Sequence, residues 1–291
     1  MRNEIKEFTN ELIKALKNRL PEGYKTEVVT VKKLNNEYEG IIVMTNESNM
    51  SPTMNLENLY ESYKNNLLSM DEICNTFIAA KKKETEFETL ETITKNYDMA
   101  KKHLFIRISS AERNRDFLAE HPHTIVEDLA ITYHIYIEKN MVEIAAFPIS
   151  NDLLCSYGID VETLHKDALD NAPKLFPVRY ENMFNCMTIV TNQEITNQEI
   201  TNGAACVFYP GVLEKIARER GSYYLLPSSI HEFIIAGEDA CNADEFVSMV
   251  KEVNGDPNII SSEDILTDNA YHYDAYDHIF ETVDNYKKRM L

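Results

Sequence analysis

The densest group of potentially reactive side chains in this sequence is Ser228-Ser229-Ile230-His231-Glu232, which lies between two apolar runs. A serine acts as a nucleophile when an imidazole lies within about 3 Å and takes the hydroxyl proton. If the segment is a strand, Ser229 and His231 point to one face about 6.5 Å apart, and Glu232 points to the other. A hydrolase with a composite site around Ser229 and His231 is therefore one hypothesis, and it needs an acid and an oxyanion-binding group from elsewhere in the fold.

The same segment has a simpler interpretation. A Pro-Ser-Ser turn, whose hydroxyls accept hydrogen bonds from backbone N–H groups, explains these residue types without a substrate. The sequence contains no GxSxG nucleophile elbow. We therefore favour the turn and assign no catalytic residue.

Two other groups contain side chains of the kinds that bind metals. His121 and His123 form a His-x-His pair, and residues 271–278 include two histidines and two aspartates. Zinc needs three or four converging ligands, and neither group has a recognised arrangement such as HExxH. A metal-binding protein is thus a second alternative, with no ligand assigned. The sequence has no P-loop and no GxGxxG motif, so we expect no nucleotide and no other cofactor.

The chain has 16 tyrosines and no tryptophan. Tyrosine combines apolar area with a hydroxyl, so a cluster of tyrosines either lines a groove for a peptide or rims the core. The late cluster consists of Tyr223, Tyr224, Tyr271, Tyr273 and Tyr276. We expect a non-catalytic binding or regulatory protein for a protein or peptide partner, with a surface formed by Ser228, Ser229, His231, Glu232, Tyr271, Tyr273 and His123.

Charge is distributed unevenly along the chain. The net charge is -19, yet residues 1–115 hold 18 basic and 18 acidic residues, whereas residues 116–291 hold 11 and 30. Such an acidic part repels phosphate backbones and anionic lipid, so we expect neither nucleic acid nor a membrane as partner. The charge pattern predicts a charge-balanced N-terminal module, 1–115, and an acidic C-terminal module, 116–291.

Composition predicts a soluble, cytoplasmic protein. Hydrophobic residues make up 44% of the chain, enough to bury a core, and no apolar run approaches the roughly 20 residues of a membrane span. The N-terminal residues are charged where a signal peptide would be apolar. The five cysteines are scattered without a CxxC pair, which predicts neither a disulfide framework nor a zinc knuckle.

Periodicity predicts the elements of the first module. Residues 4–20 carry apolar residues at three- and four-residue intervals, which indicates an amphipathic helix that ends at Pro21. The β-branched runs 28–34 and 40–44 predict a hairpin. Asn55 is a candidate N-cap for the helix that follows.

The next predicted elements lie between residues 104 and 173. Residues 104–108 predict a strand, and residues 124–137 predict either a long strand or a helix that merges into one. Residues 142–147 should pair back against them. A helix that begins near Asp160 should end before Pro173.

Residues 203–237 predict a strand-helix-strand unit. We expect a strand at 204–209, a helix at 212–219, strands at 223–226 and 230–236, and a turn at Pro227. The tandem pentapeptide TNQEI before this unit predicts a loop, and a C-terminal helix is expected from about His278. The patterns together predict an α/β (mixed α+β) protein with mixed or antiparallel sheets and flanking helices, in two modules.

Several phrases resemble a bacterial domain-of-unknown-function family along almost the full length of the chain. They are Asn49-Met50-Ser51-Pro52-Thr53, Asn202-Gly203-Ala204-Ala205-Cys206, Tyr209-Pro210-Gly211 and the segment from Leu226 to Glu232. The resemblance implies one coherent protein, and it contributes no reaction, cofactor or site residue.

Overall fold

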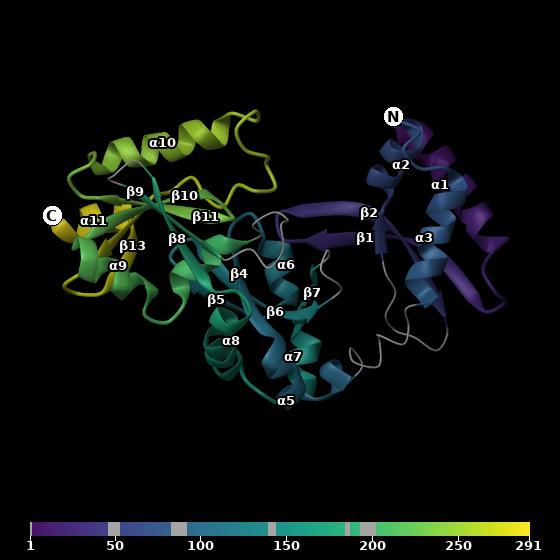
Figure 1. Ribbon diagram of the computed structural model, residues 1–291, viewed down its shortest axis with the longest axis horizontal. Coiled ribbons are helices and arrows are strands. Elements are labelled where there is room, and N and C mark those ends of the chain that lie inside the picture. Colours follow the sequence, from purple (N-terminus) through teal and green to yellow (C-terminus); the bar gives the residue numbers. More distant parts are fainter. Residues whose placement is uncertain (1, 46–52, 83–91, 139–143, 184–186, 193–201) are drawn as a thin grey trace. The chain divides into compact units, whose positions relative to one another are not determined.

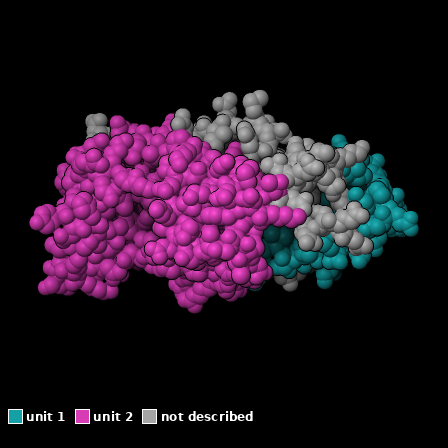
Figure 2. All heavy atoms as spheres, turned by 90° about the horizontal axis from the view of Figure 1, so that it is seen from below, with its two compact units in different colours: residues 1–91 teal, residues 92–291 magenta. Residues whose placement is uncertain are grey.

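The computed structural model describes residues 2–45, 53–82, 92–138, 144–183, 187–192 and 202–291 (Figure 1). The chain forms two compact units, residues 1–91 and residues 92–291 (Figure 2). The change in charge between residues 115 and 116 lies inside the second unit, because a strand before it, 104–110, pairs with a strand after it, 129–138. The tandem TNQEI sequence lies outside the described residues, apart from its first two positions.

Residues 1–91 combine three helices and a small antiparallel sheet among the described elements. In chain order these are α1 (Arg2–Lys17), β1 (Tyr24–Lys33), β2 (Asn36–Thr45), β3 (Thr53–Asn55), α2 (Leu56–Lys64) and α3 (Met70–Lys82). The sheet order is β1-β2-β3, so the predicted hairpin is confirmed. Asn55 caps α2 as predicted, because its side chain accepts from the backbone N–H groups of Glu57 and Asn58. Leu12, Leu16, Ile41 and Val43 lie in the core of this unit.

The second unit begins with an antiparallel sheet. Its strands are β4 (Leu104–Ser110), β5 (His123–Val126), β6 (Leu129–Glu138) and β7 (Ile144–Pro148). The order is β4-β6-β5, and β7 also pairs with β6. Residues 124–137 are thus a hairpin with its turn at Glu127 and Asp128, where Glu127 has a φ of 55°. The predicted pairing of residues 142–147 with this region is confirmed for β7.

Helices flank this sheet: α5 (Tyr97–Ala100), α6 (Arg115–Glu120), α7 (Asn151–Tyr157) and α8 (Val161–Leu175). The predicted end of α8 before Pro173 is wrong, since Pro173 lies within its last turn. A proline removes one backbone donor, and here the helix continues because Ala172 and Phe176 are buried in the core. The backbone N–H of Phe176 donates to the carbonyl of Ala172.

A second, six-stranded sheet completes the unit. Its strands are β8 (Val178–Met183), β9 (Met187–Asn192), β10 (Tyr223–Ser229), β11 (Glu232–Gly237), β12 (Tyr271–Asp274) and β13 (Ile279–Thr282), in the order β13-β12-β10-β11-β9-β8. The neighbouring helices are η3 (Gly203–Phe208), α9 (Val212–Arg220), α10 (Ala243–Gly255) and α11 (Val283–Met290), and α10 covers β10 (Figure 1). Every strand pair in the described residues is antiparallel, so the predicted mixed fold with antiparallel sheets is confirmed.

Three local predictions in this sheet are wrong. The predicted strand at 204–209 is instead the 3-10 helix η3, residues 203–208, of which residues 203–207 are buried; it begins at Gly203, where a Cβ would clash with the carbonyl oxygen of His231. Pro227 lies within β10 opposite Phe233, and the turn falls at residues 230–231. The C-terminal helix begins only at Val283, because β13 precedes it.

No helix in the described part of the chain is long and apolar enough to cross a membrane.

Candidate functional site

The turn between β10 and β11 contains the predicted serine-histidine cluster. Ser229 Oγ accepts a hydrogen bond of 3.0 Å from the backbone N–H of His231. The hydroxyl therefore stabilises the turn, as the simpler interpretation of the sequence predicts. Ser228 and Glu232 are half-buried beside it.

The imidazole of His231 is held by two other segments. Its Nδ1 accepts from the backbone N–H of Asn202 at 3.1 Å, so the proton of the neutral ring is on Nε2, which lies 3.3 Å from Asp264 Oδ1. Thr191 Oγ1 also donates to the carbonyl of His231 at 2.8 Å. Both ring nitrogens are therefore engaged away from Ser229 Oγ, and the ring links the turn to its neighbours.

The two predicted tyrosines lie in the core and not on a surface. Tyr271 and Tyr273 are 0% and 1% exposed. Tyr271 OH donates to Asp128 Oδ1 at 2.6 Å, and Tyr273 OH lies 3.1 Å from His278 Nδ1. Burial, with the nearby charge of Asp128, raises the pKa of Tyr271 well above its ordinary value. A partner cannot reach these rings, so they are removed from the predicted surface.

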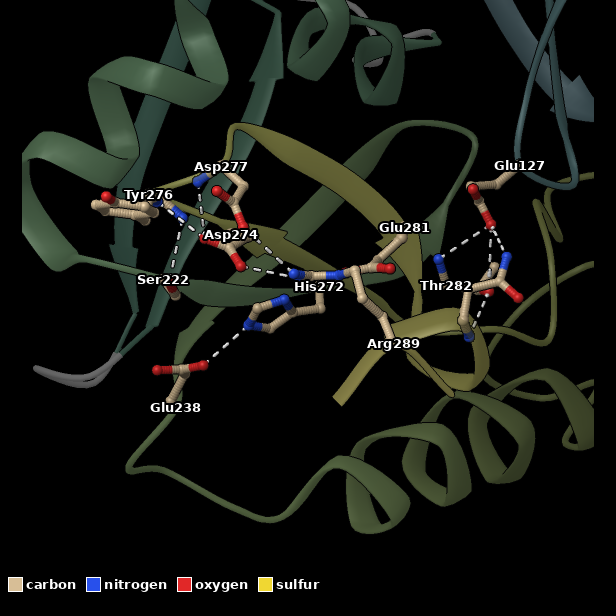
Figure 3. A network of polar contacts seen from close by, with 12 residues as sticks. Glu127, Ser222, Glu238, His272, Asp274, Tyr276, Asp277, Glu281, Thr282 and Arg289 are labelled. Carbon is tan, nitrogen blue, oxygen red and sulfur yellow. Dashed lines mark hydrogen bonds and ion pairs between the residues drawn. The ribbon is translucent and has the colours of Figure 1, made fainter. Parts of the chain in front are cut away.

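The polar residues near the C-terminus form a structural network, shown in Figure 3. Arg289 lies between Asp274 and Glu281 and donates to both, at 2.9 and 2.7 Å (Figure 3). The backbone N–H of Asp277 and then Arg289 hold the pKa of Asp274 at about 2. His272 is buried, with Nε2 2.9 Å from Glu238 Oε1. Among the described residues no group of three or more histidines, cysteines or carboxylates is placed to hold a metal ion.

The remaining predicted residue, His123, belongs to a different group on the sheet of β4, β5 and β6. Arg107 on β4 lies opposite Thr132 on β6, which in turn lies opposite His123 on β5. Ser109 and His134 lie on the same face but on opposite sides of the Arg107–Thr132 pair, since Ser109 pairs with Ala130 and His134 pairs with Phe105. We call Arg107, Ser109, Thr132, His134 and His123 the polar row.

Arg107 lies in the polar row without an acidic partner in the described part of the chain. Its Nε is buried and makes no hydrogen bond to a described residue, and the guanidinium carbon lies 5.5 Å from the centre of the Phe105 ring. Burial lowers the pKa of Arg107 to about 10, so the side chain stays charged at neutral pH. The row therefore contains a partly desolvated cation with an unused Nε–H donor.

His134 and Ser109 are also incompletely bonded. They are 2% and 0% exposed, and neither His134 Nδ1 nor Ser109 Oγ has a hydrogen-bond partner among the residues that the structure describes. Among the described residues six buried side-chain atoms lack a partner, and three of them belong to the polar row. Burial, then the charges of Arg107 and His121, lower the pKa of His134 well below its ordinary value, so the ring is neutral at pH 7.

The outer side of the polar row is held by the chain after α6. His123 Nδ1 donates to the carbonyl of His121 at 2.9 Å, and His121 Nδ1 donates to the carbonyl of Phe117 at 2.7 Å. The rings of Phe117 and His121 are stacked, with centroids 3.9 Å apart. Arg107 and His123 are only half-buried, so these two residues connect the row to solvent.

Sequence reasoning identified His123 and missed the other four members of the row. The signal was the placement of polar residues in apolar strands: Arg107 interrupts LFIRISS, and Thr132 and His134 interrupt AITYHIYI with the two-residue period of one strand face. Buried strand positions are normally apolar. A charged or polar residue at such a position therefore indicates a candidate site and not ordinary core packing.

Comparison with known proteins places the chain in a family without giving it a reaction. The model of DUF5688, a family of unknown function, matches residues 5–275. The chain belongs to this family. No curated protein and no solved structure matches it. The chemistry of this DUF5688 chain must therefore be argued from its own residues.

Proposed function

We propose that this DUF5688 protein is a non-catalytic binding or regulatory protein whose polar row holds an anionic group of its ligand. The observation that supports the proposal is the guanidinium of Arg107, which is buried at Nε and has no acidic partner in the described part of the chain. A desolvated charge without a partner costs free energy in the unliganded protein. A carboxylate or phosphate in the row would offset that cost with charge-assisted hydrogen bonds.

The polar row also supplies two buried neighbours for such a group. Ser109 Oγ and His134 Nδ1 are unpartnered on the same face, and incompletely bonded buried groups are typical of sites that complete their bonding with a ligand. The half-buried side chains of Arg107 and His123 give access from solvent.

The turn at Ser229 and His231 gives the hydrolase hypothesis no support. A general base needs a free nitrogen within reach of the nucleophile, and both ring nitrogens of His231 are engaged with Asn202 and Asp264. The expectation of a protein or peptide partner stays a prediction. Ser228 and Glu232, which are half-buried at this turn, remain the residues for contact with a partner at this end of the six-stranded sheet. Tyr276, which is 91% exposed, follows Ala275 and lies at the opposite end of β10, where Ala275 N–H donates to Ser222 Oγ.

Anion-dependent stability tests the proposal. Thermal unfolding of the full chain is measured in a buffer without carboxylate or phosphate, and then with acetate, phosphate or chloride at matched ionic strength. A ligand that binds only the folded state raises stability by RT ln(1 + [L]/Kd), about 2.7 kcal/mol at 100 times Kd. We expect at least one of these anions to raise the Tm of the wild-type protein.

Two variants locate the effect. Arg107→Gln should abolish the anion-dependent rise in Tm. Arg115→Gln should keep it, because Arg115 is exposed and its ion pair in the described part of the chain is with the exposed Glu112. The proposal is wrong if no anion raises the Tm of the wild type, or if Arg107→Gln responds as the wild type does.

A further inference from the structure

Building on the anion site proposed above, we infer that its ligand is a small 2-hydroxy carboxylate. Its carboxylate binds the guanidinium of Arg107, and its hydroxyl donates a hydrogen bond to Nδ1 of His134. The inference adds the chemical class of the ligand to the proposed function, and it follows from the direction of the hydrogen bonds, the charge of the row and the spacing of its members.

The hydrogen bonds of Thr132 determine which nitrogen of His134 carries the proton. Thr132 Oγ1 donates to the backbone carbonyl of Arg107 at 3.4 Å and lies 3.0 Å from His134 Nε2. A hydroxyl has one proton, so both contacts are hydrogen bonds only when that proton goes to the carbonyl and Nε2–H of His134 donates to Thr132 Oγ1. His134 Nδ1 then holds a lone pair, buried and without a partner. This atom needs a hydrogen-bond donor.

A plain carboxylate satisfies Arg107 and leaves His134 Nδ1 without a donor. The guanidinium presents its N–H groups as a planar fork that matches the two oxygens of a carboxylate. A hydroxyl on the ligand supplies the donor that His134 Nδ1 lacks. A ligand with both groups therefore engages Arg107 and His134 together. Ser109 lies on the other side of Arg107, opposite Ala130, and takes no part in this contact.

The charges that face the row favour a monoanion. The charged and titratable groups that face the row come from β4 (Arg107), β5 (His123), β6 (His134) and the residue after α6 (His121), and the polar row contains no carboxylate. His134 is neutral at pH 7, so Arg107 matches one negative charge. A phosphate dianion would exceed that charge, and the ammonium group of an amino acid would lie beside a guanidinium without an acid to pair with.

The spacing of the row limits the size of the ligand. Arg107 and His134 are diagonal neighbours on adjacent strands, since Arg107 pairs with Thr132 and His134 is two residues further on. Such neighbours have Cα atoms about 7–8 Å apart. Both side chains also contact Phe105, whose ring centre lies 5.5 Å from the guanidinium carbon of Arg107 and 5.5 Å from the centre of the His134 ring. A hydroxyl on the carbon next to the carboxylate is close enough to bridge this gap.

The test compares two ligands that differ by one hydroxyl. Lactate and propionate, with inorganic phosphate as the third probe, are titrated into the full chain at pH 7 and constant ionic strength, and the Nε–H resonance of Arg107 is followed by NMR. We expect lactate and propionate to shift this resonance in the wild type and in Arg115→Gln. In Arg107→Gln, which lacks the resonance, titration calorimetry should detect no binding of either ligand. One additional hydrogen bond should make lactate bind roughly three- to tenfold more tightly than propionate.

A second variant tests the role of His134. His134→Leu should bind lactate and propionate equally, while the wild type keeps its preference for lactate. If that variant does not fold, the ratio of the two affinities in the wild type still decides the matter. Equal affinities, or phosphate binding more tightly than lactate, would overturn the hydroxy-acid inference and leave the anion site in place. If none of the three probes shifts the Arg107 resonance, the proposed function itself fails.

Discussion

At the scale of single residues, Arg107 and Arg289 of the second unit have opposite surroundings. Arg289 donates to Asp274 and Glu281, and these hydrogen bonds raise its pKa. Arg107 has no such partner in the described part of the chain, and burial alone lowers its pKa to about 10. Arg289 is therefore part of a structural ion pair, whereas Arg107 has the surroundings expected of a binding site for a negatively charged group.

The buried His134 predicts a pH dependence of stability. Its pKa in the folded protein is well below the ordinary value of 6.5, so below pH 6.5 the unfolded chain binds a proton that the folded chain does not. Stability is then lost as the pH falls from 6.5 toward the folded pKa, with a slope of up to about 1.4 kcal/mol per pH unit. Urea unfolding of the wild type and of His134→Leu between pH 7.5 and 5 measures this effect.

The difference between the two profiles isolates His134, because other buried groups titrate in both proteins. One of them is His165, whose pKa is also lowered by burial. The wild type should lose more stability than His134→Leu over this range. Parallel profiles would show that His134 does not titrate as described.

At the scale of elements, the turn between β5 and β6 joins the two sheets of the second unit. Asp128 accepts from Thr267 Oγ1, Asn269 Nδ2 and Tyr271 OH, at 2.5, 3.0 and 2.6 Å. The neighbouring Glu127 accepts from Thr282 and Asn285 (Figure 3). The hairpin that carries His123 and His134 is therefore fixed against β12 and β13, which keeps the polar row in place.

This connection predicts unequal costs for two substitutions. Asp128→Ala leaves the buried Tyr271 hydroxyl and two further donors without an acceptor, and it should reduce the free energy of unfolding by roughly 2–4 kcal/mol. Tyr271→Phe removes one donor and keeps the ring, and should cost about 1 kcal/mol. Urea unfolding measures both values. Equal effects would show that the turn does not hold the sheets together.

The sequence predicts elements well where the signal is local. The hairpin of β1 and β2, the N-cap at Asn55 and the ends of α9 at Gly211 and Gly221 follow from turn and cap residues. The prediction failed for residues 204–209, whose apolar run is buried as a 3-10 helix because of tertiary packing. β13 was missed because its strand depends on pairing with β12. Such long-range contacts have no local signature.

The same difference between local signals and long-range contacts applies to the candidate site. His123 was found from its neighbour His121, whereas the row that contains it exists only through the register of β4, β5 and β6. Tyr271 and Tyr273 were assigned to a surface because a tyrosine in a strand is equally compatible with burial, and the sequence alone does not give the face.

The whole molecule has a large negative net charge and three hydrophobic clusters among the described residues. One cluster lies in residues 1–91 and two lie in residues 92–291. The net charge of -19 repels anions at long range, so binding at the row depends on the short-range contacts of Arg107. This setting disfavours polyanions and favours a small ligand with one negative charge.

The stability of Arg107→Met without ligand tests the central claim most directly. A guanidinium that serves to bind a ligand, and has no acidic partner, destabilises the unliganded protein. Replacing it with an apolar side chain of similar length should therefore raise the free energy of unfolding by about 1–3 kcal/mol. Urea unfolding in a buffer without carboxylate or phosphate measures it, with the exposed Arg115→Met, expected to change stability by less than about 0.5 kcal/mol, as the control. The account predicts a more stable Arg107→Met protein that no longer responds to lactate. A less stable Arg107→Met protein would show that Arg107 supports the fold, and would contradict the claim that the polar row is a ligand site.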